Sequence, residues 1–160
     1  MILGVDPGAG GALVLLANDG RCVDHLLMPT LKVGTKTRVN GAAIAAWVRQ
    51  GLERYPEPWH AFLERVGSMP KQGVASMFSF GHAAGLVEGV ISGANIPITL
   101  VAPAQWKRGS QLIGTEKDAA RSRAIQLYPD QRVLDTIGKG QAVADALLIA
   151  RHGLSLAPNG

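Results

Sequence analysis

The sequence predicts a single α/β domain with a mixed five-stranded sheet flanked by helices. Near the N-terminus, apolar segments are separated by short turns, which favours antiparallel strands; later, apolar segments alternate with helical patterns, which favours parallel strands. The chain has 160 residues, of which 47% are hydrophobic and 18% charged. This is enough for one domain with a buried core, and it excludes intrinsic disorder. We expect the domain to cover residues 1–156 and the tail 157–160 to be frayed.

The N-terminal segments are expected to form antiparallel hairpins. Strands are expected at residues 1–5, 12–17 and 21–28. Asn18-Asp19-Gly20 is a typical hairpin turn. Residues 29–41 are expected to form a polar loop, in which Lys32, Lys36 and Arg38 are not accompanied by any acid. Such a loop could lie against a phosphate backbone as a flexible arm.

The rest of the chain alternates helices and strands. Asn40 is expected to cap a helix that ends before Pro56, because apolar residues recur at helical spacing between them. A strand, a long helix and a second strand parallel to the first are expected at residues 59–64, 72–92 and 96–101. Thr115 is expected to cap a further helix that stops at Pro129, and the last helix is expected at residues 139–152.

Composition excludes several classes of protein. The net charge of +4 permits a polyanionic partner without requiring one. The single cysteine, Cys22, excludes an internal disulfide framework and a cysteine-rich zinc site. The start of the chain does not resemble a signal peptide, and long uncharged runs such as residues 89–106 are interrupted by Gly, Asn and Pro. We therefore expect a soluble cytoplasmic domain with no membrane span.

Three acids in apolar surroundings are the most informative residues. Asp6 and Glu64 each end an apolar strand, and Asp145 has apolar residues at three of its four neighbouring helical positions. Each acid also has an ordinary explanation: Asp6 as a turn residue, Glu64 as a solvated or Arg65-paired carboxylate, Asp145 as an acid in the first turn of a helix. If the three meet in the fold, their oxygen atoms suit Mg²⁺ or Mn²⁺.

The order and spacing of several motifs resemble the RuvC-type Holliday junction resolvases, in particular their phage-encoded branch, within the RNase H-like nucleases. The resemblance covers nearly the whole chain. The matching segments are residues 2–8 (ILGVDPG), 62–66 (FLERV) and 73–81 (GVASMFSFG), then Pro103, Trp106, Lys107, residues 117–121 (KDAAR), Ala124 and residues 144–147 (ADAL).

The resemblance implies an RNase H-like fold and a homodimer that binds four-way DNA junctions and nicks two strands symmetrically. It also implies that Asp6, Glu64 and Asp145 are the catalytic residues and metal ligands. Each site would hold Mg²⁺ as a pair of ions, with Mn²⁺ able to substitute. If the gene is carried by a phage, the protein would act in the cytoplasm of a bacterial host.

One departure from the family pattern concerns the fourth metal ligand. The family usually has a fourth acid or a histidine three residues before the last aspartate, or an acid four before it; here these positions are Ala142 and Gln141. Gln141 could offer a neutral carbonyl oxygen, and Asp135 could replace the missing acid. The resemblance therefore leaves open a weak second metal site, or a protein that binds junctions and cuts them poorly.

Other residues are candidates for DNA binding and dimerisation. Residues expected to contact DNA are Met69, Lys71, Lys107, Arg108, Lys117, Arg121 and Lys139, with solvated surface charge as the alternative for the basic ones. Phe78, Gly81, Gly85 and Gly89 are candidates for the dimer contact. Glycines at fourfold spacing indicate that another backbone approaches this helix, either the sheet below or a second copy.

Two other functions remain alternatives. The first is a junction-binding protein with impaired catalysis, which the neutral residues at 141 and 142 would explain. The second is an actin-like sugar kinase or ATPase, whose first strand also carries an acid followed by Gly. That class needs a second phosphate-binding loop and a second subdomain, and a chain of 160 residues has no room for them.

Overall fold

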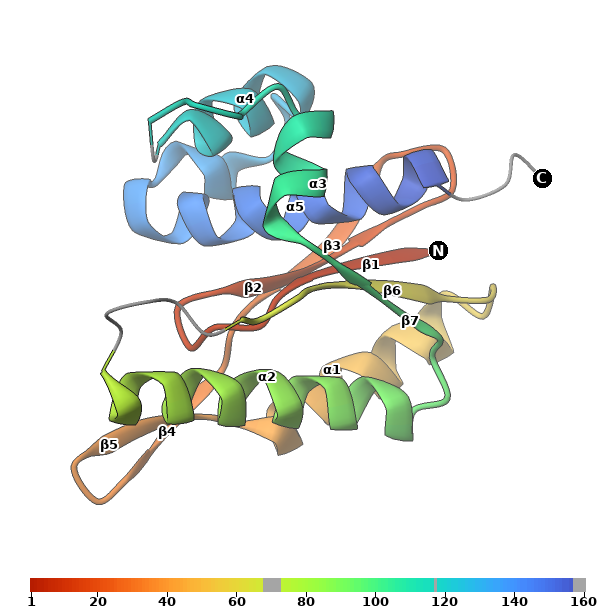
Figure 1. Ribbon diagram of the computed structural model, residues 1–160. Helices are drawn as coiled ribbons and strands as arrows, with labels where there is room; N and C mark the ends of the chain where they lie inside the picture. Colours follow the sequence, from red (N-terminus) through yellow and green to blue (C-terminus); the bar gives the residue numbers. More distant parts are fainter. Residues whose placement is uncertain (68–72, 117, 157–160) are drawn as a thin grey trace.

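The computed structural model describes residues 1–67, 73–116 and 118–156. A five-stranded sheet forms its centre, in the order β3-β2-β1-β6-β7 (Figure 1). The strands are β1 (Ile2–Asp6), β2 (Ala12–Leu16), β3 (Cys22–Leu27), β6 (His60–Glu64) and β7 (Ile98–Val101). β1, β2 and β3 are antiparallel, whereas β6 runs parallel to both β1 and β7. The predicted mixed sheet and its parallel half are confirmed.

Helices cover both faces of this sheet (Figure 1). One face carries α1 (Gly41–Arg54) and α2 (Val74–Gly93). The other carries α3 (Pro103–Gly109), α4 (Ala119–Leu127), a short 3-10 helix η1 (Arg132–Asp135) and α5 (Ile137–Leu156). Asn40 caps α1 as expected, because its side chain accepts a hydrogen bond of 3.2 Å from the backbone N–H of Ala43.

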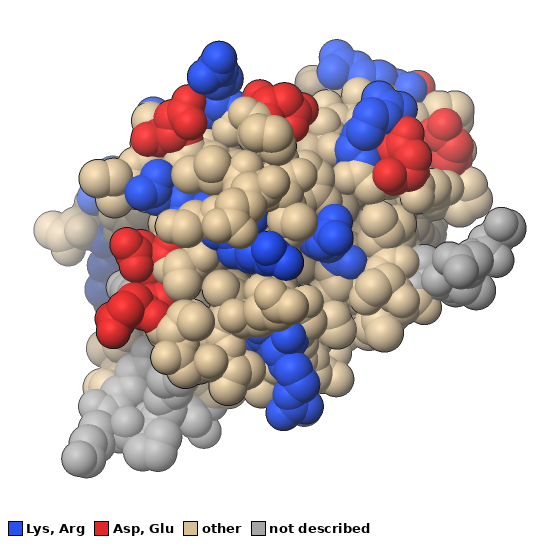
Figure 2. Space-filling model, turned by 90° about the horizontal axis from the view of Figure 1, so that it is seen from above, with Lys and Arg blue, Asp and Glu red and all other residues tan. Residues whose placement is uncertain are grey.

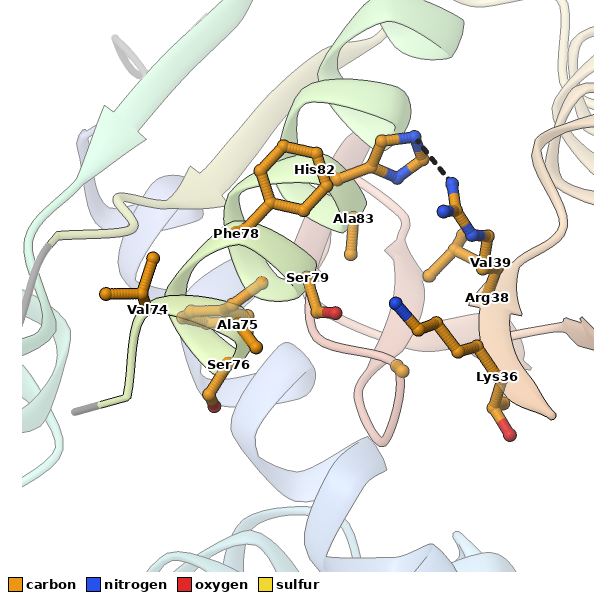
Figure 3. Close-up of a pocket in the computed structure, with 13 residues that line it drawn as sticks. Lys36, Arg38, Val39, Val74, Ala75, Ser76, Phe78, Ser79, His82 and Ala83 are labelled. Atoms are coloured by element: carbon orange, nitrogen blue, oxygen red, sulfur yellow. Dashed lines mark hydrogen bonds between the residues drawn. The ribbon is translucent and has the colours of Figure 1, made fainter.

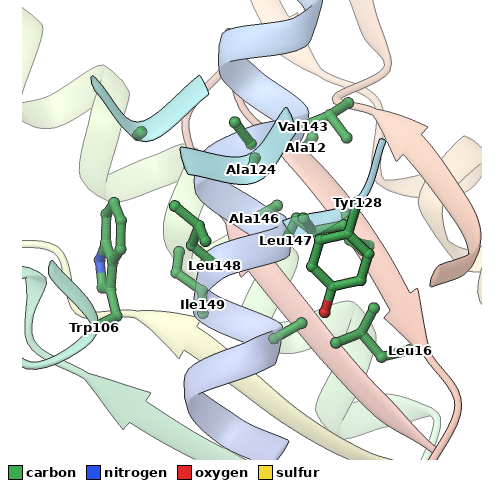
Figure 4. Close-up of a cluster of buried hydrophobic side chains, with 14 of the residues drawn as sticks. Ala12, Leu16, Trp106, Ala124, Tyr128, Val143, Ala146, Leu147, Leu148 and Ile149 are labelled. Carbon is green, nitrogen blue, oxygen red and sulfur yellow. The ribbon is translucent and has the colours of Figure 1, made fainter. Parts of the chain in front are cut away.

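Successive side chains of the central strands enter two separate cores, because side chains alternate across a strand. Leu3 and Val5 pack on the side of α1 and α2. Ile2 and Phe62 pack on the opposite side, with the apolar residues of α5 (Figure 4). Residues of even number in β1 and β6 therefore face α5.

Gly4 lets α5 approach the central strand closely. A Cβ atom at this position would collide with the carbonyl oxygen of Ala146 and with the backbone nitrogen of Ala150. Only glycine permits this contact between a strand and a helix. The fit fixes α5 against β1, and with it the height at which Asp145 lies above the sheet.

The prediction of a polar loop at residues 29–41 is wrong. β4 (Thr30–Val33) and β5 (Lys36–Val39) form a separate two-stranded hairpin that turns at Gly34, whose φ is 60°. The four residues of β4, TLKV, alternate between polar and apolar, but all four are exposed and the run is too short to stand out in the sequence.

The starts of α4 and α5 differ from the prediction, and α3 was not predicted. Thr115 does not cap α4, which begins at Ala119, because the Thr115 hydroxyl donates a hydrogen bond of 2.8 Å to the carbonyl of Leu112 instead. The short helix α3, which opens with Pro103, was not expected at all. The last helix begins at Ile137 rather than near residue 139.

The helix α2 has an unusually apolar surface. By length and composition alone it could cross a membrane, contrary to the expectation that no segment could, and it is the one such helix in the described part of the chain. This is weak grounds for a membrane span, since core helices of soluble proteins pass the same test. Here Val87 and Ile91 are buried against the sheet, while Val74 and Phe78 are 79% and 68% exposed. One face of α2 is thus packed and another is bare.

Candidate active site

Two of the three candidate acids lie side by side at the ends of parallel strands. Gly4 pairs with Phe62 and Val5 with Leu63, so the next positions in register are Asp6 and Glu64. Both have even numbers, and both therefore face the α5 side of the sheet. The carboxyl ends of parallel strands are where α/β sheets usually place their sites.

The third acid, Asp145, belongs to the same group. The pKa of Asp6 is raised to about 7, most of all by burial, next by the negative charge of Glu64, and also by that of Asp145. The backbone N–H of Gly8, which donates to Oδ1 of Asp6 at 3.4 Å, acts in the opposite direction. The fold thus brings together three acids that are 58 and 81 residues apart in the sequence (64 − 6 and 145 − 64).

Glu64 is held by a residue to which the sequence assigned no role. The indole Nε1 of Trp106 donates a hydrogen bond of 2.8 Å to Oε1 of Glu64. Trp106 lies on α3 and is only 2% exposed. The signal that could have identified it is general: a buried tryptophan needs a partner for its N–H group.

Asp145 is contacted by Gln141, one helical turn earlier on α5. The amide Nε2 of Gln141 donates a hydrogen bond of 3.1 Å to Oδ1 of Asp145. Ala142 is buried. Asp135 lies in η1, is exposed, and forms an ion pair of 3.6 Å with Arg132. Of the two candidates for a fourth ligand, Gln141 is therefore the one in contact with a site acid.

The donor chemistry of these residues fits a hard divalent cation. Carboxylate oxygens are the ligands that Mg²⁺ and Mn²⁺ prefer, and a cation would relieve the repulsion that raises the pKa of Asp6. As the side chains stand, no three His, Cys, Asp or Glu residues in the described ranges enclose an ion position. One oxygen of Glu64 already accepts a hydrogen bond from Trp106, and one oxygen of Asp145 accepts one from Gln141.

The candidate DNA-binding residues fall into three groups. Lys107, Arg108 and Lys139 are exposed, and the Lys107 ammonium lies 5.4 Å from the centre of the Trp106 ring. Arg121 is half-buried and donates a hydrogen bond of 3.0 Å to the carbonyl of Leu134, so it has a structural role. Met69, Lys71 and Lys117 lie outside the described residues. Figure 2 shows basic and acidic side chains interspersed over the face formed by α3, α4 and α5.

The candidate dimer residues lie on the bare face of α2. Phe78 is exposed, and so are Gly81, Gly85 and Gly89. A Cβ atom added at any of these three glycines would meet nothing within 4 Å. Of the two partners left open by the sequence, the sheet below is therefore wrong.

Comparison with known proteins relates this geometry to solved structures. No protein-family model and no curated protein matches the chain. Among solved structures, Thermus thermophilus RuvC in complex with a Holliday junction substrate is similar, with a TM-score of 0.64 and 18% identity over 97% of this chain and 94% of that one. The chain has a RuvC-like fold. A second T. thermophilus RuvC structure matches with a TM-score of 0.58, the same identity and the same coverage.

The RuvC-like fold confirms the predicted fold class, an α/β domain of the RNase H-like type with a mixed five-stranded sheet. An identity of 18% shows the fold alone. The chemistry must therefore be argued from the residues of this chain.

Proposed function

We propose that the protein is a metal-dependent, structure-selective DNA endonuclease that resolves Holliday junctions and other branched DNA by symmetric nicking. One observation carries this proposal: Asp6, Glu64 and Asp145 gather at the ends of β1 and β6 beneath α5. The RuvC-like fold supports it, and one of the similar structures contains a Holliday junction substrate.

In this proposal, the three carboxylates would hold Mg²⁺ or Mn²⁺, as a pair of ions per site. Such a pair, when bound, activates water and stabilises the leaving oxygen of an in-line displacement at phosphorus. The residues of the chain set the protonation and the orientation of these carboxylates. Asp6 must lose its proton to act as a ligand, while Trp106 fixes one oxygen of Glu64 and leaves the other free.

Gln141 motivates the second candidate function, a junction-binding protein with impaired catalysis. Three carboxylates supply fewer negative charges than two divalent cations supply positive ones, and Gln141 contacts Asp145 through a neutral N–H donor. In the nuclease proposal, the scissile phosphate makes up this deficit, so the second ion is recruited with the substrate. In the alternative, the second ion site stays too weak for cutting.

The bare face of α2 supports a homodimer. A twofold particle carries two active sites and so explains paired nicks in a near-symmetric junction. The exposed glycines would let the helix of a second copy approach closely. Placement in the phage-encoded branch, and with it a bacterial host cytoplasm, remains a prediction from the sequence motifs.

The test is cleavage of a synthetic four-way junction with Mg²⁺ or Mn²⁺, beside a linear duplex made from the same arm sequences. The proposal expects paired nicks in opposite strands of the junction and little cutting of the duplex. Tight junction binding without nicking in either ion would instead support the second candidate. Equal cutting of both substrates would contradict structure selectivity.

A further inference from the structure

A groove of about 1100 Å³ runs between the β4–β5 hairpin and the N-terminal half of α2 (Figure 3). Lys36 and Arg38 of β5 form one wall, and Phe78 and His82 of α2 form the other. Residues 29–41 were expected to be a flexible loop that could lie against a phosphate backbone, whereas the β4–β5 pairing makes them a wall of this groove.

The groove is basic on its hairpin wall. No Asp or Glu is found among the residues that line it in the described chain, and residues 25–52 contain no acid at all. Lys36 is exposed and Arg38 is half-buried, and Nη1 of Arg38 lies 3.4 Å from Nε2 of His82. This charge is complementary to a polyanion rather than to an average protein surface.

The opposite wall offers an aromatic surface. Phe78 is 68% exposed, and its ring centre lies 6.3 Å from that of His82. A basic track beside an exposed aromatic ring is the usual arrangement for an unpaired nucleic-acid strand, since phosphates bind the cations while a base stacks on the ring. A duplex keeps its base faces stacked inside and offers the ring nothing to stack on.

The groove also reaches the loop that follows Asp6. Ala9, three residues after Asp6, lines it. The ring of Phe80, another lining residue, lies 3.4 Å from where a Cβ of Gly8 would be. A DNA strand with a phosphate at the acids can therefore continue past the loop after β1 into the groove.

From these contacts we propose that the groove binds one unpaired strand of branched DNA, with its phosphates on Lys36 and Arg38 and a base on Phe78. This rests on the proposed nuclease function and adds the path of the strand beside the site. It also moves Phe78 from the candidate dimer contact to the strand path, whereas Gly81, Gly85 and Gly89 do not line the groove and stay with the dimer face.

The experiment measures binding of a four-way junction and of a single-stranded oligo(dT) without divalent ions, from 50 to 200 mM salt. The variant is Lys36→Gln with Arg38→Gln. The control is Lys32→Gln, which removes one positive charge from the same hairpin. Lys32 does not line the groove and donates a hydrogen bond of 2.7 Å to the hydroxyl of Thr37. A further variant, Phe78→Leu, keeps an apolar side chain and removes the ring.

The double variant should bind both DNAs about tenfold more weakly, and its plot of log K against log salt should be about 1.5 less steep. Lys32→Gln should leave the slope unchanged. Phe78→Leu should weaken oligo(dT) binding several-fold without changing the slope or the mass of the particle in solution. Circular dichroism checks that each variant is folded.

Unchanged slopes in the double variant, with a wild type that binds and nicks junctions, would overturn the strand path and leave the proposed function standing. Loss of the dimer in the double variant would overturn it too, because it would assign the groove to a second copy of the chain. A wild type that binds no junction would refute the proposed function itself.

Discussion

The indole of Trp106 donates a hydrogen bond of 2.8 Å to the carboxylate of Glu64 and links the short helix α3 to the end of β6. It orients one acid of the candidate site by a neutral donor from the core. The same hydrogen bond therefore contributes to the stability of this part of the fold and to the orientation of Glu64 in the site.

Trp106→Phe should lower cleavage of a four-way junction by about tenfold and the free energy of unfolding by about 1–2 kcal/mol. It keeps most of the packing but leaves Glu64 without this donor. The matched control is Trp59→Phe, because buried Trp59 donates a similar hydrogen bond of 3.0 Å to the carbonyl of Tyr55 on the other side of the sheet. The control should lose similar stability and retain cleavage. Equal losses of cleavage in both variants would show that Trp106 acts through stability alone.

The sheet and the three acids were predictable for a physical reason. A buried strand consists of consecutive apolar residues. An acid at the end of such a run, such as Asp6 or Glu64, is therefore easy to recognise in the sequence. Asp145 stands out because carboxylates are costly among apolar helical neighbours. The contact between Trp106 and Glu64 spans 42 residues and leaves no local pattern. The β4–β5 hairpin was missed because each of its strands has only four residues, most of which are exposed and most of which are polar.

Asp6→Asn should stabilise the ion-free protein near neutral and alkaline pH. An acid whose folded pKa is about 7, against 3.8 in its reference state, binds its proton more tightly when folded. The folded state is therefore favoured at low pH, and this contribution is lost as the pH rises from about 4 to about 7. The cost to the wild type at pH 8 is on the order of 2–4 kcal/mol.

Urea unfolding at about pH 4 and pH 8 tests this. The variant should gain stability over the wild type at the higher pH, and the two should converge at the lower one. Asp130→Asn, at an exposed acid, serves as the control and should change stability at neither pH. A wild type that is as stable as Asp6→Asn at pH 8 would contradict the raised pKa of Asp6 and the burial and repulsion that cause it.

Gln141→Glu should lower the concentration of Mg²⁺ needed for half-maximal cleavage by several-fold. Gln141 already contacts Asp145, so the new carboxylate adds a charged ligand where the wild type has a neutral amide. Ala142→Asp should act in the same direction, and Mn²⁺ should be effective at lower concentration than Mg²⁺ in the wild type. Asp135→Asn should leave the titration unchanged, because Asp135 faces Arg132. If Asp135→Asn raised the metal requirement and Gln141→Glu did not lower it, Asp135 would be the fourth ligand.

Gly85→Leu should break the dimer and leave the fold of the subunit intact. A side chain at this position meets open space in the subunit but would enter the interface with a second copy, and leucine favours a helix over glycine by up to about 1 kcal/mol. Gly138→Leu, also in open space but on α5, is the control. Sedimentation velocity should give a monomer for the first variant and a dimer for the second and for the wild type. A wild type that is monomeric at micromolar concentration and still makes paired nicks would rule out the α2 dimer.

The most direct test of the account compares wild type, Asp6→Asn, Glu64→Gln and Asp145→Asn on one labelled four-way junction, with binding and nicking measured on the same samples. Carboxylates hold the ions, whereas basic side chains hold the phosphates. Each substitution should therefore abolish nicking and leave junction binding unchanged or slightly stronger. Near-normal turnover in any one of the three variants would contradict the assignment of that acid to the active site.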